Sequence, residues 1–287
     1  MDTIKNPVEY AGAQVVQAAH GIASAYHSLQ HIQETIHSPA PAVRRIGLRD
    51  LRDALEKGFD DFGAYRSDVV FVGAIYAAAG LVLARLAFGL DMLPLVFPLA
   101  SGFALVGPLA AIGLYEMSRL RELGQEVSWR NAVDVIHAPS AGAIAVLGIV
   151  LITTLLVWLF AAWDIFAHTL GPATPASIGA FLHDVFFTPA GWAMIGIGVG
   201  IGFLFALFAL AFGIVSFPLL VDRDVGLDTA VKTSFRATRM NPLLVAAWGL
   251  IVAAGLVLGS IPFFVGLVVV LPVLGHATWH LYRRLVA

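Results

Sequence analysis

Six apolar stretches dominate this sequence, and each is long enough to cross a lipid bilayer. They lie near residues 68–90, 92–117, 140–163, 190–219, 242–260 and 261–282. A spanning helix requires about 20 predominantly apolar residues to cross about 30 Å of hydrocarbon. The stretches are rich in Ala, Gly and Leu and lack the alternation of barrel strands, so helices must satisfy the backbone hydrogen bonds in lipid. The sequence therefore predicts an all-α membrane bundle of six transmembrane helices.

Composition supports a membrane location and narrows the chemistry. Hydrophobic residues make up 59% of the chain and charged residues 13%, whereas charged residues are about a quarter of an ordinary globular domain. The sequence has no cysteine, which excludes disulfides, thiolate metal sites and iron–sulfur clusters. The middles of the predicted spans hold almost no ionisable residue, although proton relays and ion pathways need them there. We therefore expect no cofactor and no enzyme.

Lysine and arginine set the predicted orientation, because cytoplasmic loops retain positive charge. All of the 17 basic residues except Arg85 fall before the first span, between spans two and three, between spans four and five, or after the sixth. The segment from Asp164 to Ala190 contains none. This distribution predicts a multi-pass protein of the bacterial inner membrane with both termini in the cytoplasm.

A short amphipathic segment precedes each predicted helical hairpin, which indicates an internal repeat. The three units cover about residues 47–118, 127–219 and 226–284. They align at Ala54, Ala132 and Ala230, and again at Gly58, Ile136 and Ser234. Because every unit begins on the cytoplasmic side, the sequence predicts three parallel repeats, each an interfacial helix plus a hairpin.

Two of the amphipathic segments have clear helical periodicity. Between residues 48 and 65 the apolar face carries Leu48, Leu51, Leu55, Phe59 and Phe62, and charged residues take the other face. Between residues 227 and 240 the apolar face carries Leu227, Val231, Ser234 and Phe235, and Asn241-Pro242 predicts the break that follows. The polar face of this second segment carries Lys232, Arg236 and Arg239, which we expect to face anionic lipid headgroups. No nucleic-acid partner is expected, since the chain has no recognition motif.

Residues 1–41 are predicted to form an N-terminal cytoplasmic helix and linker, separate from a membrane domain over residues 42–287. Apolar residues in the arm step by three and four, which is the seam of a coiled coil. The principal seam positions are Val8, Val15, Ile22, Leu29 and Ile36. The seam favours contact with a partner protein or self-association, and docking onto the chain's own bundle explains it equally well.

Other motifs have both a functional and a structural interpretation. Gly196, Gly198, Gly200 and Gly202 lack the context of a phosphate-binding loop and instead predict close helix packing in lipid. His276 and His280, one helical turn apart, could bind a metal or haem, but an interfacial belt explains them too. Two histidines and two aspartates between residues 164 and 184 lack tight ligand spacing, and solvated polar residues explain them.

Several segments resemble a bacterial integral-membrane family of unknown function, domain of unknown function 2189. They are Leu48 to Phe62, Gly107-Pro108-Leu109, Leu114-Tyr115-Glu116, and Ser216 to Leu220 with Asp222-Arg223. The resemblance covers about residues 44–285 and implies the six-helix architecture without any catalytic residue. More distantly, Ala230 to Pro242 is similar to the membrane domain of some glycerophosphodiester phosphodiesterases.

Together these observations predict a non-catalytic scaffold or accessory subunit of a membrane complex, a respiratory complex being one candidate. The alternatives are a protein that binds or transports lipid or a small solute, and a haem or metal protein that uses His276 and His280. Membrane lipids are the other expected partners.

Overall fold

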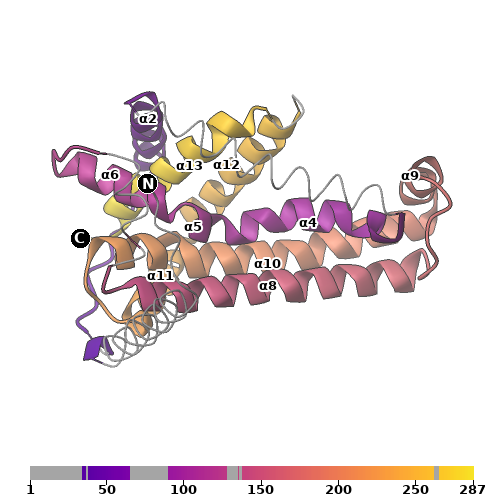
Figure 1. The fold of residues 1–287 in the computed structure, drawn as a ribbon, viewed down its shortest axis with the longest axis horizontal. Coiled ribbons are helices and arrows are strands. Elements are labelled where there is room, and N and C mark those ends of the chain that lie inside the picture. The colour runs from indigo at the N-terminus through magenta and orange to yellow at the C-terminus, as the bar shows by residue number, and fades with distance from the viewer. Residues whose placement is uncertain (1–33, 37, 65–89, 128–134, 136–137, 262–264) are drawn as a thin grey trace, which may run out of the picture.

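The computed structural model describes residues 34–36, 38–64, 90–127, 135, 138–261 and 265–287 (Figure 1). The α-helices are α2 (Leu48–Ala64), α4 (Val96–Gly102), α5 (Gly107–Ala110), α6 (Ile112–Glu122), α8 (Ala141–Thr169), α9 (Ile178–Phe187), α10 (Pro189–Asp222), α11 (Leu227–Met240), α12 (Pro242–Ser260) and α13 (Leu267–Leu285). The 3₁₀ helices are η1 (Leu90–Leu95) and η2 (Phe103–Val106). Over these residues the only extended pairing is one isolated antiparallel bridge between Val43 and Val286. The all-α prediction is confirmed.

Four helical stretches in the described part of the chain are long and apolar enough to cross a membrane. They are Met92–Glu122, Ala141–Thr169, Pro189–Asp222 and Pro242–Ser260. The first predicted span, residues 68–90, lies almost entirely outside the described residues. Helix α13, which covers most of the sixth, is not among the four, and two histidines and two arginines lie in its second half. The six-span arrangement stays a prediction.

Helices α8 and α10 run side by side along the long axis of the molecule (Figure 1), and α4 packs on α8. The indole Nε1 of Trp158 in α8 donates a hydrogen bond to the Pro98 carbonyl of α4 at 2.9 Å. Helix α9 lies at one end of this layer and is followed at once by α10. The Thr188 side chain caps α10 by accepting a hydrogen bond from Gly191 N at 3.0 Å.

Helix α10 has two parts with different surroundings. About 20 residues, from Pro189 to Phe208, suffice to cross the hydrocarbon core, and most of them are exposed or half-buried. Every residue from Ala211 to Leu220 is buried. Helices α6, α11 and α13 pack against α10, and α2 packs on α13. We call the region formed by residues 211–220, α2, α11 and the adjoining parts of α6 and α13 the base.

Helix α11 packs on α10 through small residues. The Ser234 hydroxyl donates to the Ala211 carbonyl at 2.7 Å and accepts from Val215 N at 3.2 Å. The buried face of α11 consists of Thr229, Ala230, Thr233, Ser234 and Ala237. Phe235, which belongs to the predicted apolar face, is 36% exposed. Close approach of the two backbones selects small side chains for the contact.

Helix α2 also uses a face that its apolar periodicity does not predict. Its buried residues are Leu51, Ala54, Gly58 and Asp61. A Cβ atom at Gly58 would lie 2.6 Å from Ala277 Cβ of α13, so the two helices touch backbone to backbone here. Leu48 and Phe59, which belong to the predicted apolar face, are 73% and 57% exposed. The close crossing with α13 leaves no room for large side chains on the contact face.

The segment before α2 is held firmly to the base, and we call residues 38–46 the strap. The Ser38 hydroxyl accepts a hydrogen bond from Gly226 N at 2.8 Å, just before α11 begins. Asn241, just after α11 ends, accepts a hydrogen bond from Ile46 N at 2.9 Å. The strap therefore contacts both ends of α11.

Candidate functional site

Five polar side chains from α2, α6 and α13 meet inside the base and form one hydrogen-bonded cluster, which we call the polar junction. Its members are Asp61 of α2, Ser118 and Arg121 of α6, and His276 and His280 of α13. Asp61, Ser118 and His276 are 4%, 1% and 0% exposed. The side chains of Arg121 and His280 are more accessible and lie at its rim.

Helical periodicity brings these residues together. Residues three and four apart lie on one helix face, so Ser118 and Arg121 share a face of α6, while His276 and His280 share a face of α13. Asp61 follows Gly58 by three residues and continues the small-residue face of α2. The tight crossing at Gly58 therefore places the Asp61 carboxylate against α6 and α13.

Both oxygens of the Asp61 carboxylate are occupied. Ser118 Oγ lies 2.6 Å from Oδ2, and His280 Nε2 lies 2.8 Å from the same oxygen. Arg121 Nη1 donates to Oδ1 at 2.6 Å and forms an ion pair. Charge-assisted hydrogen bonds of this kind are about twice as strong as neutral ones. Asp61 thus connects α2 to both other helices.

The hydrogen-bond pattern determines where the protons lie. An ionised carboxylate only accepts, so Ser118 must donate its single proton to Asp61 and His280 must donate from Nε2. The Ser118 oxygen then accepts from His276, whose Nδ1 lies 2.8 Å away. His276 accordingly carries a proton on Nδ1, and the chain of hydrogen bonds runs from α13 through α6 to α2.

Opposing effects act on the pKa of Asp61. Burial raises the pKa of its carboxyl, because low polarity disfavours the charged form. Hydrogen bonds from His280 and Ser118 lower it, as do the charges of the two histidines. Together these contacts outweigh burial and hold the pKa of Asp61 below its ordinary value. The carboxylate is therefore ionised at neutral pH.

This arrangement differs from that of a catalytic serine. In a Ser-His-Asp triad the histidine lies between the other two groups and accepts the serine proton. Here Ser118 lies between Asp61 and His276 and donates its proton to the carboxylate. Ser118 is also 1% exposed, so a substrate carbonyl has no access to its oxygen. The polar junction acts as a cross-link among three helices.

His276 and His280 are used by the same network. His280 Nε2 bonds to Asp61, while His276 Nδ1 bonds to Ser118 and lies 3.9 Å from Asp61 Oδ2. No group of three or more His, Cys, Asp or Glu side chains suited to a metal ion occurs among the described residues. The sequence suggested a metal or an interfacial belt for these histidines, but it did not suggest a buried carboxylate as their partner.

A second polar cluster lies where α13 meets the end of α10. Tyr282 Oη donates to Asp222 Oδ2 at 2.6 Å, and Arg283 Nη1 donates to the same oxygen at 3.3 Å. Arg283 Nε and Trp279 Nε1 both donate to Glu122 at 3.2 Å. The last turns of α13 are therefore tied to α6 and α10 as well as to α2.

The three predicted lipid-facing cations lie on the outer side of α11, and all are exposed. Lys232 pairs with Asp228 one turn earlier, at 2.9 Å. Arg236 and Arg239 form no ion pair with any described residue. Their role in lipid contact stays a prediction, and the two arginines are better placed for it than Lys232.

Of the four glycines predicted to pack closely, one has a close neighbour among the described residues. Cβ atoms added at Gly196, Gly198 or Gly200 would meet nothing within 4 Å, because this face of α10 is open. At Gly202 a Cβ would lie 3.0 Å from the Trp158 ring of α8. Of the four predicted glycines, Gly202 alone therefore supports close packing of α10 against a described residue.

Some of the remaining predicted residues lie in the described part of the chain, and others lie outside it. The seam positions Val8, Val15, Ile22 and Leu29 lie outside the described residues, and Ile36 is 44% exposed. In the segment between α8 and α10, Asp164 and His168 pair only with each other at 3.4 Å, and both are exposed. His183 likewise lies beside its neighbour Asp184.

The fold and the buried polar contacts define a class, the multi-pass helical integral membrane proteins. Within it, residues 96–222 match the model of a family described as "Predicted integral membrane protein (DUF2189)". The predicted family resemblance is confirmed over this segment, from α4 to the end of α10, rather than over residues 44–285. No curated protein and no solved structure matches the chain significantly, so the similarity to glycerophosphodiester phosphodiesterases stays a prediction.

Proposed function

We propose that this protein is a non-catalytic accessory or scaffold subunit of a membrane complex. The supporting observation is the use of its reactive side chains: Asp61, Ser118 and both junction histidines bond to one another inside the base. Cross-links of this type position helices, whereas catalysis needs a group that can reach a substrate. A rigid base of this kind suits a protein that holds other components in place.

We also propose the full topology of six spans with both termini in the cytoplasm of a bacterial inner membrane. The apolar segment at residues 68–90 and helix α13 would add two spans to the four candidates. The base gathers α2, α11 and the charged ends of α6 and α13 at one end of the molecule, opposite α9 (Figure 1). Positive charge at the base supports the proposal that this end faces the cytoplasm.

Helix packing supports the proposed threefold repeat. Helix α2 of the first unit packs on α13 of the third, and α11 of the third unit packs on α10 of the second. The aligned residues Gly58 and Ser234 both lie at these crossings. Val135, from the middle unit, lines a cavity of about 110 Å³ with Glu116 and Arg119 of α6 in the first unit. Each amphipathic segment therefore approaches the second hairpin helix of another unit.

The N-terminal arm is the proposed contact with a partner. The strap is fixed to both ends of α11, and the predicted N-terminal helix precedes the strap in the sequence. A seam of apolar residues on such a helix would bury its surface against another helix. This position suits recruitment of a protein on the cytoplasmic side.

We expect deletion of residues 1–33 to remove co-purifying proteins while leaving the membrane domain folded. The deletion spares the strap, so its effect reports on the arm alone. A finer test is Ile22→Glu, which places a charge in the seam, with His20→Glu on the opposite face as the matched control. The measurement is purification in mild detergent followed by mass spectrometry of all bound proteins. An unchanged set of partners for both the deletion and Ile22→Glu would refute the proposal.

A further inference from the structure

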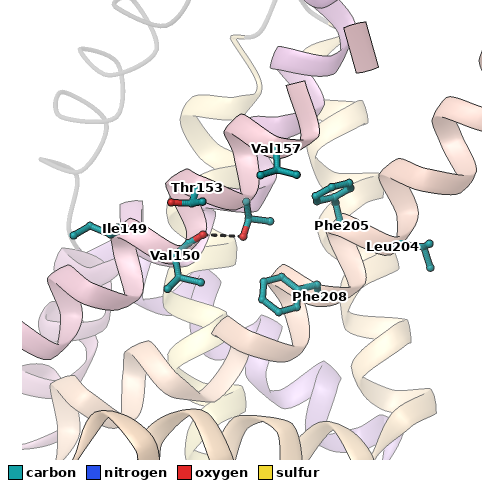
Figure 2. A pocket seen from close by; sticks show the side chains of 8 residues that line it. Ile149, Val150, Thr153, Val157, Leu204, Phe205 and Phe208 are labelled. Atoms are coloured by element: carbon teal, nitrogen blue, oxygen red, sulfur yellow. Dashed lines mark hydrogen bonds between the residues drawn. The ribbon is translucent and has the colours of Figure 1, made fainter. Parts of the chain in front are cut away.

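An open apolar groove runs between α8 and α10 (Figure 2). It has a volume of about 440 Å³, and Ile149, Thr153 and Val157 of α8 face Leu204, Phe205 and Phe208 of α10. Thr154 donates its hydroxyl to the Val150 carbonyl at 2.7 Å, so this polar group is satisfied within its own helix. The groove therefore presents almost only hydrocarbon surface.

Aromatic rings connect one end of the groove to α11. The Phe208 ring, which lines the groove, lies 5.6 Å from the Phe212 ring and 6.5 Å from the Phe235 ring, between centroids. Phe208 and Ile149 are the lining residues closest to the base along their helices. The groove thus opens toward the base at Phe235.

Cations lie at this end of the groove. Arg236 adjoins Phe235 in the sequence, and Arg239 follows Phe235 by one helical turn, on the same face. Both arginines are exposed, and neither pairs with a described carboxylate. Lys232 lies on the same face but is paired with Asp228. Two available guanidinium groups therefore lie beside the entrance to an apolar groove.

We propose that this site binds one anionic phospholipid, with its phosphate on Arg236 and Arg239 and an acyl chain in the groove. The depth agrees with this assignment. Since the residues from Pro189 to Phe208 suffice to cross the bilayer, Phe208 lies near the edge of the hydrocarbon, where phosphates and cations meet. Guanidinium groups bind phosphate oxygens in a two-pronged geometry. The inference goes beyond the proposed accessory role and does not depend on it.

The test uses the full-length protein in mild detergent, titrated with phosphatidylglycerol and followed by native mass spectrometry. Phosphatidylcholine with the same acyl chains is the control lipid. At about fivefold in affinity for each cation near the surface, Arg236→Gln with Arg239→Gln is expected to weaken phosphatidylglycerol binding about 30-fold. The matched control Arg49→Gln with Lys57→Gln removes the same charge from exposed positions of α2 and should change binding little. Arg236→Lys with Arg239→Lys should retain most of the affinity.

The groove is tested separately by Leu204→Trp, which fills it, against Phe203→Trp, which alters an exposed neighbour outside the lining. Leu204→Trp should weaken binding of both lipids, and Phe203→Trp should not. Equal affinity for the two lipids, or an equal loss in the two double glutamine variants, would overturn the proposal. A second copy of the chain or a partner helix seated in the groove of the purified protein would overturn it as well.

Discussion

Replacement of Asp61 by Asn is expected to destabilise the protein by about 3 kcal/mol, because removing one partner of a buried ion pair leaves the other uncompensated. The asparagine side chain would retain one acceptor oxygen where the carboxylate now serves three donors, on Ser118, Arg121 and His280. The exposed part of Arg121 stays hydrated, which places the expected loss at the lower end of the usual range. Helices α2, α6 and α13 would all lose a shared contact.

The measurement is the free energy of unfolding in mild detergent at neutral pH. Asp60→Asn is the matched control, since Asp60 is the adjacent residue, has the same charge and is exposed. Surface substitutions of this kind usually change stability by about 0.5 kcal/mol or less. Equal stability of the two variants would show that the polar junction contributes nothing to the fold.

We also expect the stability difference between wild type and Asp61→Asn to depend on pH. Because the folded-state pKa of Asp61 lies below its ordinary value of 3.8, the carboxylate adds stability that is fully present above the ordinary pKa. That contribution is lost as the pH falls through the lower, folded-state pKa. Asp61→Asn lacks this group, so the stability difference between wild type and variant should shrink as the pH falls below about 4. A difference that stays constant or grows below about pH 4 would contradict the hydrogen-bond assignment.

Replacement of Gly58 by Val is expected to have a comparable or larger effect. A Cβ at this position would lie 2.7 Å from the Val273 carbonyl oxygen and 2.8 Å from Ala277 N, both backbone atoms that cannot move without displacing α13. Overpacking of a tight contact typically costs about 1–3 kcal/mol, and more where the backbone is fixed. Separation of α2 from α13 would also withdraw Asp61 from the polar junction.

Gly63→Val on the same helix is the control, because a Cβ at Gly63 would meet nothing within 4 Å. Both variants replace a glycine of α2 with the same β-branched residue, so the change in helix propensity does not account for a difference between them. The thermal midpoints of the two variants in detergent should therefore differ widely, with Gly58→Val the lower. If Gly63→Val were as damaging, the close crossing of α2 and α13 would not be correct.

The local features of this fold could be predicted from the sequence. Helix α11 spans Leu227–Met240 as its periodicity and the Asn241-Pro242 break predicted, and α2 ends within one residue of the expected boundary. Both predictions rest on short-range patterns of apolar residues and on proline stereochemistry. The apolar length of the spans similarly located α8, α10 and α12.

The polar junction could not be predicted, because its partners are far apart in the chain. His280 bonds to Asp61 across 219 residues, and Ser118 bonds to Asp61 across 57. Apolar periodicity also gave no sign of Asp61, since it grouped the large apolar residues of α2 on a face that does not include this aspartate. The small residues Ala54 and Gly58 are the sequence feature that accompanies the close helix crossing, but they indicate it only when the partner helix is known.

We propose a sided protein whose base, with α2, α6 and α11, faces the cytoplasm while α9 faces the opposite side. The chain contains no cysteine, so single cysteines can be placed at exposed positions without background labelling. Suitable positions are Lys57, Gln125, Ala176 and Lys232. With a membrane-impermeant maleimide on intact spheroplasts, only Ala176→Cys should be labelled, and the other three should react only after permeabilisation. Labelling of Lys57→Cys, Gln125→Cys or Lys232→Cys in intact spheroplasts, or protection of Ala176→Cys, would contradict the proposed orientation.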